Sequence, residues 1–248
     1  MRPSPSFSRR ALVTGASGSI GSAIARTLAE QGHEVLVHAN RRREAAEALV
    51  AEVQAAGGKA QAVVFDVTDR AACEAALTTQ VEEGGPIQIV VNNAGIHDDA
   101  VFPGMRAEQW GRVIDVNLNG FFNVTQPLML PLLRTRWGRV IAITSVAAQA
   151  GNRGQVNYAA AKGALHSAVK ALALECASRG ITVNAVAPGI IASEMSADVF
   201  DEASIRRLVP MQRAGLPQEV ADLVGFLASD KASYISGQTI AINGGMYS

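Results

Sequence analysis

The chain comprises 248 residues, of which 48% are hydrophobic and 18% are charged, and this composition excludes an intrinsically disordered protein. Lysine plus arginine and aspartate plus glutamate each number 22, so the net charge gives no indication of a nucleic-acid or membrane partner. No window approaches the roughly 18 consecutive apolar residues of a membrane span, and residues 1–8 are expected to form a short tail, not a signal peptide.

Short runs rich in β-branched residues alternate with longer helical patterns along the chain. Pro127 and Pro131 fall within a long helical pattern and are expected to bend or interrupt it. The segment 189–211 fits no single pattern and is interpreted as a mobile lid over the substrate. The expected order is strand 11–14, helix 19–31, strand 35–38, helix 43–56, strand 60–65, helix 69–82, strand 87–92, helix 107–134, strand 139–144, helix 155–178, strand 182–187, helix 218–228 and strand 239–242.

This alternation continues without a linker or a change of composition. It therefore predicts one α/β domain over residues 9–248, a doubly wound Rossmann-type fold with a parallel sheet of about seven strands. Ligands of such sheets bind beyond the carboxyl ends of the strands. Cys73 and Cys176 are far apart and form no metal or redox motif, so no metal site is expected and a reducing cytoplasm suits them.

A glycine-rich turn, Thr14 to Gly21, joins the first expected strand to the first expected helix. Small residues let a backbone approach a pyrophosphate, and a helix N-terminus offers free N–H groups and the positive end of its dipole. The second strand is followed by Asn40 and then by Arg41, Arg42 and Arg43, without the acidic residue that would bond a ribose 2′-hydroxyl. Arginine is a charge-assisted partner for a 2′-phosphate, so the sequence favours NADP, with Arg41 as the first candidate.

Tyr158 and Lys162 are spaced i to i+4 on the helix expected over 155–178, so they share one face. A tyrosine hydroxyl has a pKa near 10, and a nearby ammonium favours the phenolate and lowers that pKa toward the operating pH. Ser145 follows the strand expected over 139–144, and Asn117 lies in the long helix before it. Together with the phosphate-binding turn, these four residues indicate an oxidoreductase.

These motifs resemble those of the short-chain dehydrogenase/reductase family over about residues 9–247, including the Asn92-Asn93-Ala94-Gly95 run. The resemblance implies that Ser145 and Tyr158 bind the substrate carbonyl, Tyr158 donates the proton, Lys162 holds the nicotinamide ribose and Asn117 holds a relay water. The family's middle glycine is replaced here by Ser19. The cofactor contacts it implies are Gly15, Ser17, Gly18, Ser19, Ile20, Gly21, Asn40, Arg41, Asp66, Val67, Asn93, Ala94, Gly95, Tyr158, Lys162, Pro188, Gly189, Ile191 and Ser193.

Within that family, the stretches 151–158 and 179–189 are similar to the 3-oxoacyl-(acyl carrier protein) reductases of bacterial fatty acid synthesis. That resemblance implies an acyl carrier protein as partner, Arg136 and Arg179 as docking residues near the site mouth, and a homotetramer. The run His97-Asp98-Asp99-Ala100 also resembles a branch that reduces 3-oxoacyl chains in aryl polyene synthesis, although His97 itself is interpreted as a surface-loop residue. Two alternatives remain open: an enzyme acting on acetoacetyl-CoA or another ketone or alcohol, and an NADP-binding sensor without catalysis.

Overall fold

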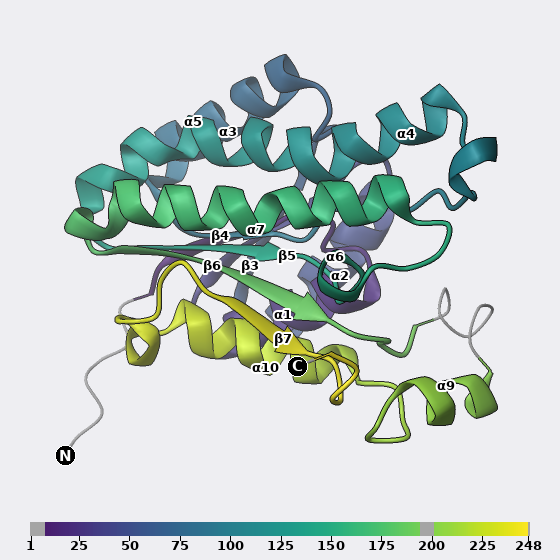
Figure 1. The fold of residues 1–248 in the computed structure, drawn as a ribbon. Helices are drawn as coiled ribbons and strands as arrows, with labels where there is room; N and C mark the ends of the chain where they lie inside the picture. Colours follow the sequence, from purple (N-terminus) through teal and green to yellow (C-terminus); the bar gives the residue numbers. More distant parts are fainter. Residues whose placement is uncertain (1–7, 194–200, 248) are drawn as a thin grey trace.

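Seven parallel strands form one sheet, in the order β3-β2-β1-β4-β5-β6-β7 (Figure 1). The structure is a computed structural model that describes residues 8–193 and 201–247, so the expected tail lies outside the described residues except for Ser8. The parallel sheet and its strand number confirm the predicted fold class. The strands are β1 (Arg10–Val13), β2 (Glu34–Ala39), β3 (Lys59–Val64), β4 (Ile87–Asn92), β5 (Gly138–Ile143), β6 (Ile181–Pro188) and β7 (Thr239–Ile242).

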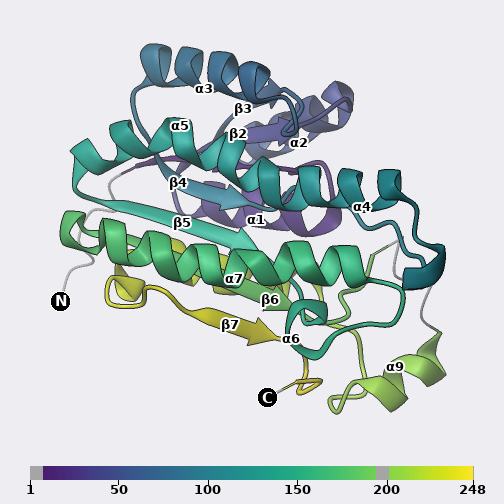
Figure 2. The ribbon, with the colours of Figure 1, turned by 45° about the horizontal axis from the view of Figure 1, so that its top comes forward.

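Helices cover both faces of this sheet, as Figure 1 and Figure 2 show. One face carries α1 (Ser19–Glu30), α2 (Arg43–Ala55) and α10 (Pro217–Ala228). The other face carries α3 (Arg70–Gly84), α5 (Gly120–Thr135) and α7 (Val156–Cys176), with α4 (Ala107–Ile114) leading into α5. The shorter helical segments are η1 (Phe102–Gly104), α6 (Ala147–Ala150), η3 (Ala177–Arg179), α9 (Glu202–Leu208) and η4 (Asp230–Ala232).

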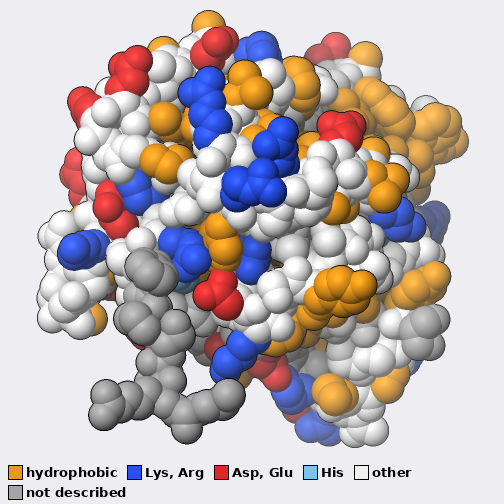
Figure 3. All heavy atoms as spheres, turned by 90° about the vertical axis from the view of Figure 1, so that its left-hand side faces the viewer, with side chains coloured by type: hydrophobic (Ala, Val, Ile, Leu, Met, Phe, Trp, Pro, Cys, Tyr) orange, Lys and Arg blue, Asp and Glu red, His pale blue; other side chains and the backbone are white. Residues whose placement is uncertain are grey.

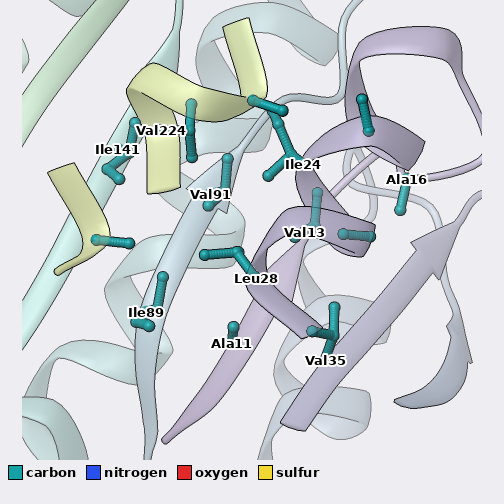
Figure 4. Close-up of a cluster of buried hydrophobic side chains, with 14 of the residues drawn as sticks. Ala11, Val13, Ala16, Ile24, Leu28, Val35, Ile89, Val91, Ile141 and Val224 are labelled. Carbon is teal, nitrogen blue, oxygen red and sulfur yellow. The ribbon is translucent and has the colours of Figure 1, made fainter. Parts of the chain in front are cut away.

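Two hydrophobic cores fill the spaces between the sheet and its helices. Successive side chains of a strand point to opposite faces, so Val13 packs toward α1 and α10 (Figure 4) while the adjacent Leu12 packs toward the layer of α3, α5 and α7. Both side chains are fully buried. This burial on both faces is why the strands read as continuous apolar runs. Cys73 and Cys176 are free thiols buried in the second core.

The strand order reverses at β1, which pairs with β2 on one side and with β4 on the other. The crossovers of β1 and β4 therefore leave in opposite directions and open a crevice beyond the carboxyl ends of these strands. The glycine-rich turn follows β1 and the Asn93–Gly95 run follows β4, so the fold brings the two predicted cofactor segments together there. Among the described helices, none is long and apolar enough to cross a membrane.

Pro127 and Pro131 were expected to bend or interrupt their helix; the interruption is wrong, because α5 runs through both of them, while the bend stays a prediction. Each proline removes one intrahelical hydrogen bond. The fully buried Leu128 and Leu132 offset that loss by packing on the sheet. The irregularity lies upstream, where a π-helical segment, η2 (Asp115–Asn119), separates α4 from α5.

Candidate active site

Tyr158 stands in the first turn of α7, and its side chain is hydrogen-bonded to that of Ser145, just beyond the end of β5. Ser145 Oγ also accepts a hydrogen bond of 3.1 Å from the N–H of Ala147, the first residue of α6. That contact fixes the serine hydroxyl at the start of a short helix which the sequence did not predict. The structure thus brings together the two hydroxyls that were expected to share a substrate oxygen.

Burial raises the pKa of Tyr158 above its ordinary value. The hydrogen bond from Ser145 opposes this rise, and the charge of Asp99 adds to it. The sequence led us to expect a net lowering by Lys162, and in this structure the desolvation of the phenol outweighs any such effect. Tyr158 is therefore a protonated acid at neutral pH, which is the form that a carbonyl reduction requires of it.

Lys162 follows Tyr158 by one turn and is 3% exposed, with Nζ donating a 2.8 Å hydrogen bond to the Ile143 carbonyl. Burial lowers the pKa of Lys162 to about 8. The ammonium is 5.8 Å from the centre of the Tyr158 ring. Gly95 lies against it, since a Cβ on Gly95 would stand 3.1 Å from Nζ. The absence of a side chain at Gly95 keeps the approach to this lysine open.

Asn117 belongs to the π-helical segment, and this explains its orientation. In a π turn the backbone N–H reaches the fifth preceding carbonyl, so the Val113 carbonyl loses its α-helical donor. The side-chain Nδ2 of Asn117 supplies that donor at 2.8 Å and also bonds the Ile96 carbonyl at 2.7 Å. Its buried Oδ1 accepts no hydrogen bond from the described residues. Asn117 and Lys162 both line a cavity of about 10 Å³, close to the smallest that holds a water molecule.

Hydrogen bonds of Thr14 and Asn93 join the glycine-rich turn after β1 to the segment that follows β4. Thr14 Oγ1 accepts from the N–H groups of Asn93 (2.9 Å) and Ala94 (3.0 Å), and Asn93 Nδ2 donates to the carbonyls of Thr14 (2.9 Å) and Gly15 (3.1 Å). Thr14 was absent from the predicted site, although it opens the motif. Asn93 braces the turn through its side chain, in addition to the ribose contact expected of it.

His38 is a further residue that the sequence reasoning missed. Its Nδ1 accepts from the Gly15 N–H at 3.1 Å, so Nε2 carries the proton and donates to the Phe65 carbonyl at 2.9 Å. The His38 carbonyl accepts from the Ala16 N–H at 2.9 Å. The side chain is 1% exposed, and burial lowers its pKa to about 4. His38 therefore ties the ends of β2 and β3 to the phosphate-binding turn.

The turn and α1 form a cradle that fits a dinucleotide. Gly15 has φ +63°, and a Cβ there would stand 2.9 Å from the Ala94 backbone. A Cβ on Gly21 would meet the Gly15 carbonyl and Ala16. Among the described residues no side chain caps the N-terminus of α1, so its N–H groups face the turn. The structure gathers the predicted turn residues there: Gly15, Ser17, Gly18, Ser19, Ile20 and Gly21.

The expected adenosine contacts lie at the ends of β2 and β3. Asn40 Nδ2 donates to Asp66 at 3.3 Å, and Arg41 is exposed beside them. The N–H and hydroxyl of Thr68 both donate to Asp66, which lowers the pKa of its carboxyl. The Val67 carbonyl accepts from Asn123 at 2.9 Å, so an adenine contact by the Val67 backbone falls to its N–H.

Beyond β6, Gly189 donates to the Ile242 carbonyl at 2.9 Å, and a Cβ there would stand 2.8 Å from Asn243. Pro188 ends β6, and Ile191 pairs with Gly215 in an isolated bridge. Ser193 is the last described residue before a gap. Part of the proposed lid, residues 194–200, lies outside the described residues, and α9 follows it. A cavity of about 320 Å³ lies beside this segment, lined by residues that include Ile190, Ile191, Val209, Met211 and Ile242.

A polar network holds the loop after β4 against the start of α7. Asn157 Nδ2 donates to the carbonyls of Asp98 (3.0 Å) and Gln109 (3.3 Å), and Gln155 Nε2 donates to Asp99 at 2.8 Å. Asp99 also pairs with His97 at 3.1 Å, and the His97 ring meets the Tyr158 ring edge-on, with 6.5 Å between centroids. His97 is exposed in this loop, as expected of a surface-loop residue, and its ring also lies beside that of Tyr158.

The structure does not bring Arg136 and Arg179 to the mouth of this site. Arg136 ends α5, Arg179 precedes β6, and the Arg136 carbonyl lies against Gly180. The two exposed arginines are therefore neighbours, separated from Tyr158 by the length of α7, which is about 30 Å for a helix of this size. Figure 3 faces that end of the molecule, where blue Lys and Arg side chains gather.

Comparisons with known proteins agree with this geometry. A family model described as enoyl-(acyl carrier protein) reductase matches residues 15–247. Proteins named 3-oxoacyl-(acyl carrier protein) reductase FabG are similar over nearly their whole length. That of Aggregatibacter actinomycetemcomitans is 45% identical over 97% of this chain and 100% of its own. The Staphylococcus aureus protein is 45% identical over 97% and 99%. The Escherichia coli protein is 45% identical over 96% of each chain.

Proposed function

Since this chain belongs to the short-chain dehydrogenase/reductase family, which uses nicotinamide cofactors, we propose that it reduces 3-oxoacyl groups on acyl carrier protein to 3-hydroxyacyl groups, with NADPH as cofactor. The observation that carries this proposal is the hydrogen-bonded pair of Ser145 and Tyr158, beside the buried Lys162. Such a reaction belongs to the synthesis of fatty acids or of polyene-type acyl chains.

These side chains have distinct roles in the proposed reaction. The chemistry that a reduced nicotinamide would supply when bound is hydride transfer to the carbonyl carbon. Charge then develops on the carbonyl oxygen, where Ser145 and Tyr158 donate hydrogen bonds and Tyr158 transfers its proton. The Ala147 N–H holds the Ser145 oxygen in place for this, so only the hydroxyl proton has to turn from Tyr158 to the substrate oxygen.

Lys162 and Asn117 assist proton donation by Tyr158, the proposed acid. The Lys162 ammonium would hold the nicotinamide ribose, and its charge favours the phenolate that forms when Tyr158 gives up its proton. The buried Oδ1 of Asn117 and the small cavity shared with Lys162 support a water between them as the route by which the proton is replaced. The π turn fixes the orientation of this amide, because the Val113 carbonyl accepts a hydrogen bond from its Nδ2.

NADP is proposed from the charge at the end of β2. Arg41 is exposed at the ribose end of the cradle, next to Asn40 and Asp66, and a 2′-phosphate there forms charge-assisted hydrogen bonds. Arg42 precedes α2, and Arg43 pairs with Glu47 at 3.5 Å. Proposed donors to the pyrophosphate are the backbone N–H groups of Ser17, Ser19 and Ile20, and proposed contacts of the carboxamide are Ile191 and Ser193.

The proposed docking of acyl carrier protein at Arg136 and Arg179 has a geometric consequence. Carrier proteins are acidic, and basic residues complement them. Because these arginines lie about one length of α7 from their own Tyr158, a carrier bound there serves the site of a neighbouring copy. The docking proposal therefore depends on the proposed homotetramer, and Arg136→Glu should reduce turnover of carrier-linked but not CoA-linked substrate. Equal turnover of both by that variant would contradict docking.

A substrate panel tests the proposed function. Purified protein with NADPH or NADH is given 3-oxoacyl and enoyl thioesters, each linked to carrier protein or to CoA. Oxidation of the cofactor is followed by the absorbance of the reduced nicotinamide. We expect rapid reduction of the 3-oxoacyl carrier thioester and loss of turnover by about 10²–10⁴-fold in Tyr158→Phe. Faster reduction of the enoyl thioester, or NADPH binding without reduction of any thioester, would overturn the proposal.

A further inference from the structure

The catalytic face of α7 continues for one more turn than the mechanism uses. Tyr158, Lys162 and His166 follow each other at intervals of four residues, so their side chains lie in one row. The side chain of Tyr158 is hydrogen-bonded to that of Ser145. Lys162 Nζ donates to the Ile143 carbonyl at 2.8 Å. His166 Nε2 lies 3.0 Å from Thr144 Oγ1. Three successive turns of the helix therefore contact three consecutive residues at the end of β5.

The hydrogen-bond directions in the third contact are fixed. Thr144 Oγ1 donates its proton to the Val186 carbonyl of β6 at 3.0 Å, and the Thr144 N–H donates to the same carbonyl at 2.7 Å. Since the hydroxyl proton is already used, Oγ1 accepts from His166, whose Nε2 carries the hydrogen. His166 thereby locks the Thr144 side chain between α7 and β6. Thr144 is 3% exposed, so water has little access to the bond.

We propose that His166 is a positioning residue for Ser145, acting through Thr144. Thr144 immediately precedes Ser145, and the chain leaves the sheet at this point to form α6. With Thr144 held from both sides, the strand end cannot shift relative to α7, so the Ser145 hydroxyl stays in register with Tyr158. A hydroxyl displaced by about 1 Å loses much of its value to a transition state. This inference rests on the proposed carbonyl reduction.

His166 keeps this role over the neutral pH range. Burial and the charge of Lys170, one turn further along α7, lower the pKa of His166, so the ring is neutral there. Nε2 carries a hydrogen in the fixed neutral tautomer and also in the protonated ring. The bond to Thr144 therefore does not depend on titration. What matters is a donor at the position of Nε2.

Two substitutions of His166 separate the bond from the packing. His166→Leu removes the donor and keeps an apolar stem, and His166→Gln places an amide N–H near the position of Nε2. We expect His166→Leu to lower kcat by roughly three- to tenfold, as the loss of one hydrogen bond would, with the KM for NADPH unchanged. His166→Gln should restore most of the rate. Thr144→Val should lower kcat similarly, and the double variant should lose little more than either single one.

His33→Leu is the control, because His33 is a buried histidine that precedes β2, a strand separated from β5 by β1 and β4. It makes the same chemical change without touching β5, and its kcat should equal that of the wild type. If His166→Leu has full kcat, or if Leu and Gln at position 166 lower kcat equally, the positioning role is refuted.

A titration of Tyr158 tests the same inference without substrate, so its outcome is independent of the proposed function. The hydrogen bond from Ser145 lowers the pKa of Tyr158. Loss of register should therefore move the phenol's ultraviolet titration to higher pH in His166→Leu but not in His166→Gln. Subtracting the curve of the matching Tyr158→Phe double variant isolates this residue from the other two of the three tyrosines. Identical titrations of Tyr158 in the wild type and His166→Leu would overturn the inference.

Discussion

The Lys162 ammonium lies 5.8 Å from the centre of the Tyr158 ring and one helical turn beyond it. Its hydrogen bond to the Ile143 carbonyl anchors it to the last residue of β5, two residues before Ser145. The two residues are perturbed by the same burial in opposite senses: the pKa of Tyr158 rises, and that of Lys162 falls to about 8. A closed site strengthens the interaction between the ammonium and the phenolate that forms during proton transfer.

Lys162→Met should abolish most activity while leaving the fold intact. Loss of the ammonium should lower turnover by about 10²–10⁴-fold. The free energy of unfolding at pH 7 should fall by no more than about 1 kcal/mol, because one hydrogen bond is lost while a buried charge is removed. Urea denaturation and NADPH oxidation assays measure both quantities. Lys170→Met, exposed on the same helix, is the control and should keep its activity.

The free energy of unfolding should depend on pH differently in Lys162→Met and in the wild type. The pKa of Lys162 is about 8 in the folded protein and near 10.5 when unfolded, so between these values the unfolded state binds more protons. Stability therefore rises with pH across this window, by up to about 3 kcal/mol for this residue. The stability of the wild type relative to Lys162→Met should increase from pH 8 to pH 10.5. Parallel stability curves would contradict a depressed lysine pKa.

Gly15→Ala and Gly18→Ala should differ sharply, although both lie in the glycine-rich turn. Gly15 has φ +63° and its Cβ would press on the Ala94 backbone at 2.9 Å, whereas a Cβ on Gly18 would meet the Gly15 carbonyl at an ordinary 3.5 Å. Gly15→Ala should destabilise the fold by roughly 1–3 kcal/mol and weaken NADPH binding. Gly18→Ala should cost less than about 1 kcal/mol, because alanine is a poorer N-cap than glycine, and should weaken NADPH binding less than Gly15→Ala does. Thermal unfolding and fluorescence titration with NADPH provide the comparison, and equal effects would refute it.

The locally encoded parts of the fold could be predicted from the sequence. Strands and helices were predictable because apolar runs and helical periods are local, and Gly32 and Gly57 do adopt the positive φ expected after a helix. Gly18 stands one place before Ser19, the residue that replaces the family's middle glycine. The Gly18 φ of −91° shows an extended N-cap that many residues could adopt.

The unpredicted parts depend on contacts between distant segments. No local sequence pattern marks the π turn at Asn117. His38 and His166 read as ordinary histidines, since their partners, Gly15 and Thr144, lie 23 and 22 residues away along the chain. The position of Arg136 relative to Tyr158 follows from the direction of α7, which residue similarity alone does not convey.

Arg41→Ala should reduce the preference for NADPH over NADH. Loss of a charge-assisted contact to a 2′-phosphate should weaken NADPH binding by about 10- to 100-fold and leave NADH binding nearly unchanged. Dissociation constants for both cofactors, measured by fluorescence, check this. Arg26→Ala removes an arginine that pairs with Glu52 at 2.6 Å on the surface of α1 and serves as the control. An equal loss of affinity for both cofactors would show that Arg41 does not contact the phosphate.

His38 should make both stability and cofactor binding sensitive to acid. Its pKa is about 4 in the folded protein against an ordinary 6.5, so the unfolded state binds the extra proton first as pH falls. The stabilisation is complete above about pH 6.5 and is lost as pH falls toward 4, by up to about 3 kcal/mol. Protonation places a hydrogen on Nδ1, where the Gly15 N–H now donates, so the phosphate-binding turn should loosen in the same window.

His38→Gln does not titrate there, and urea denaturation between pH 7 and pH 4 should show the wild type losing stability relative to this variant. A constant difference across that range would mean that His38 does not carry the acid sensitivity of the turn.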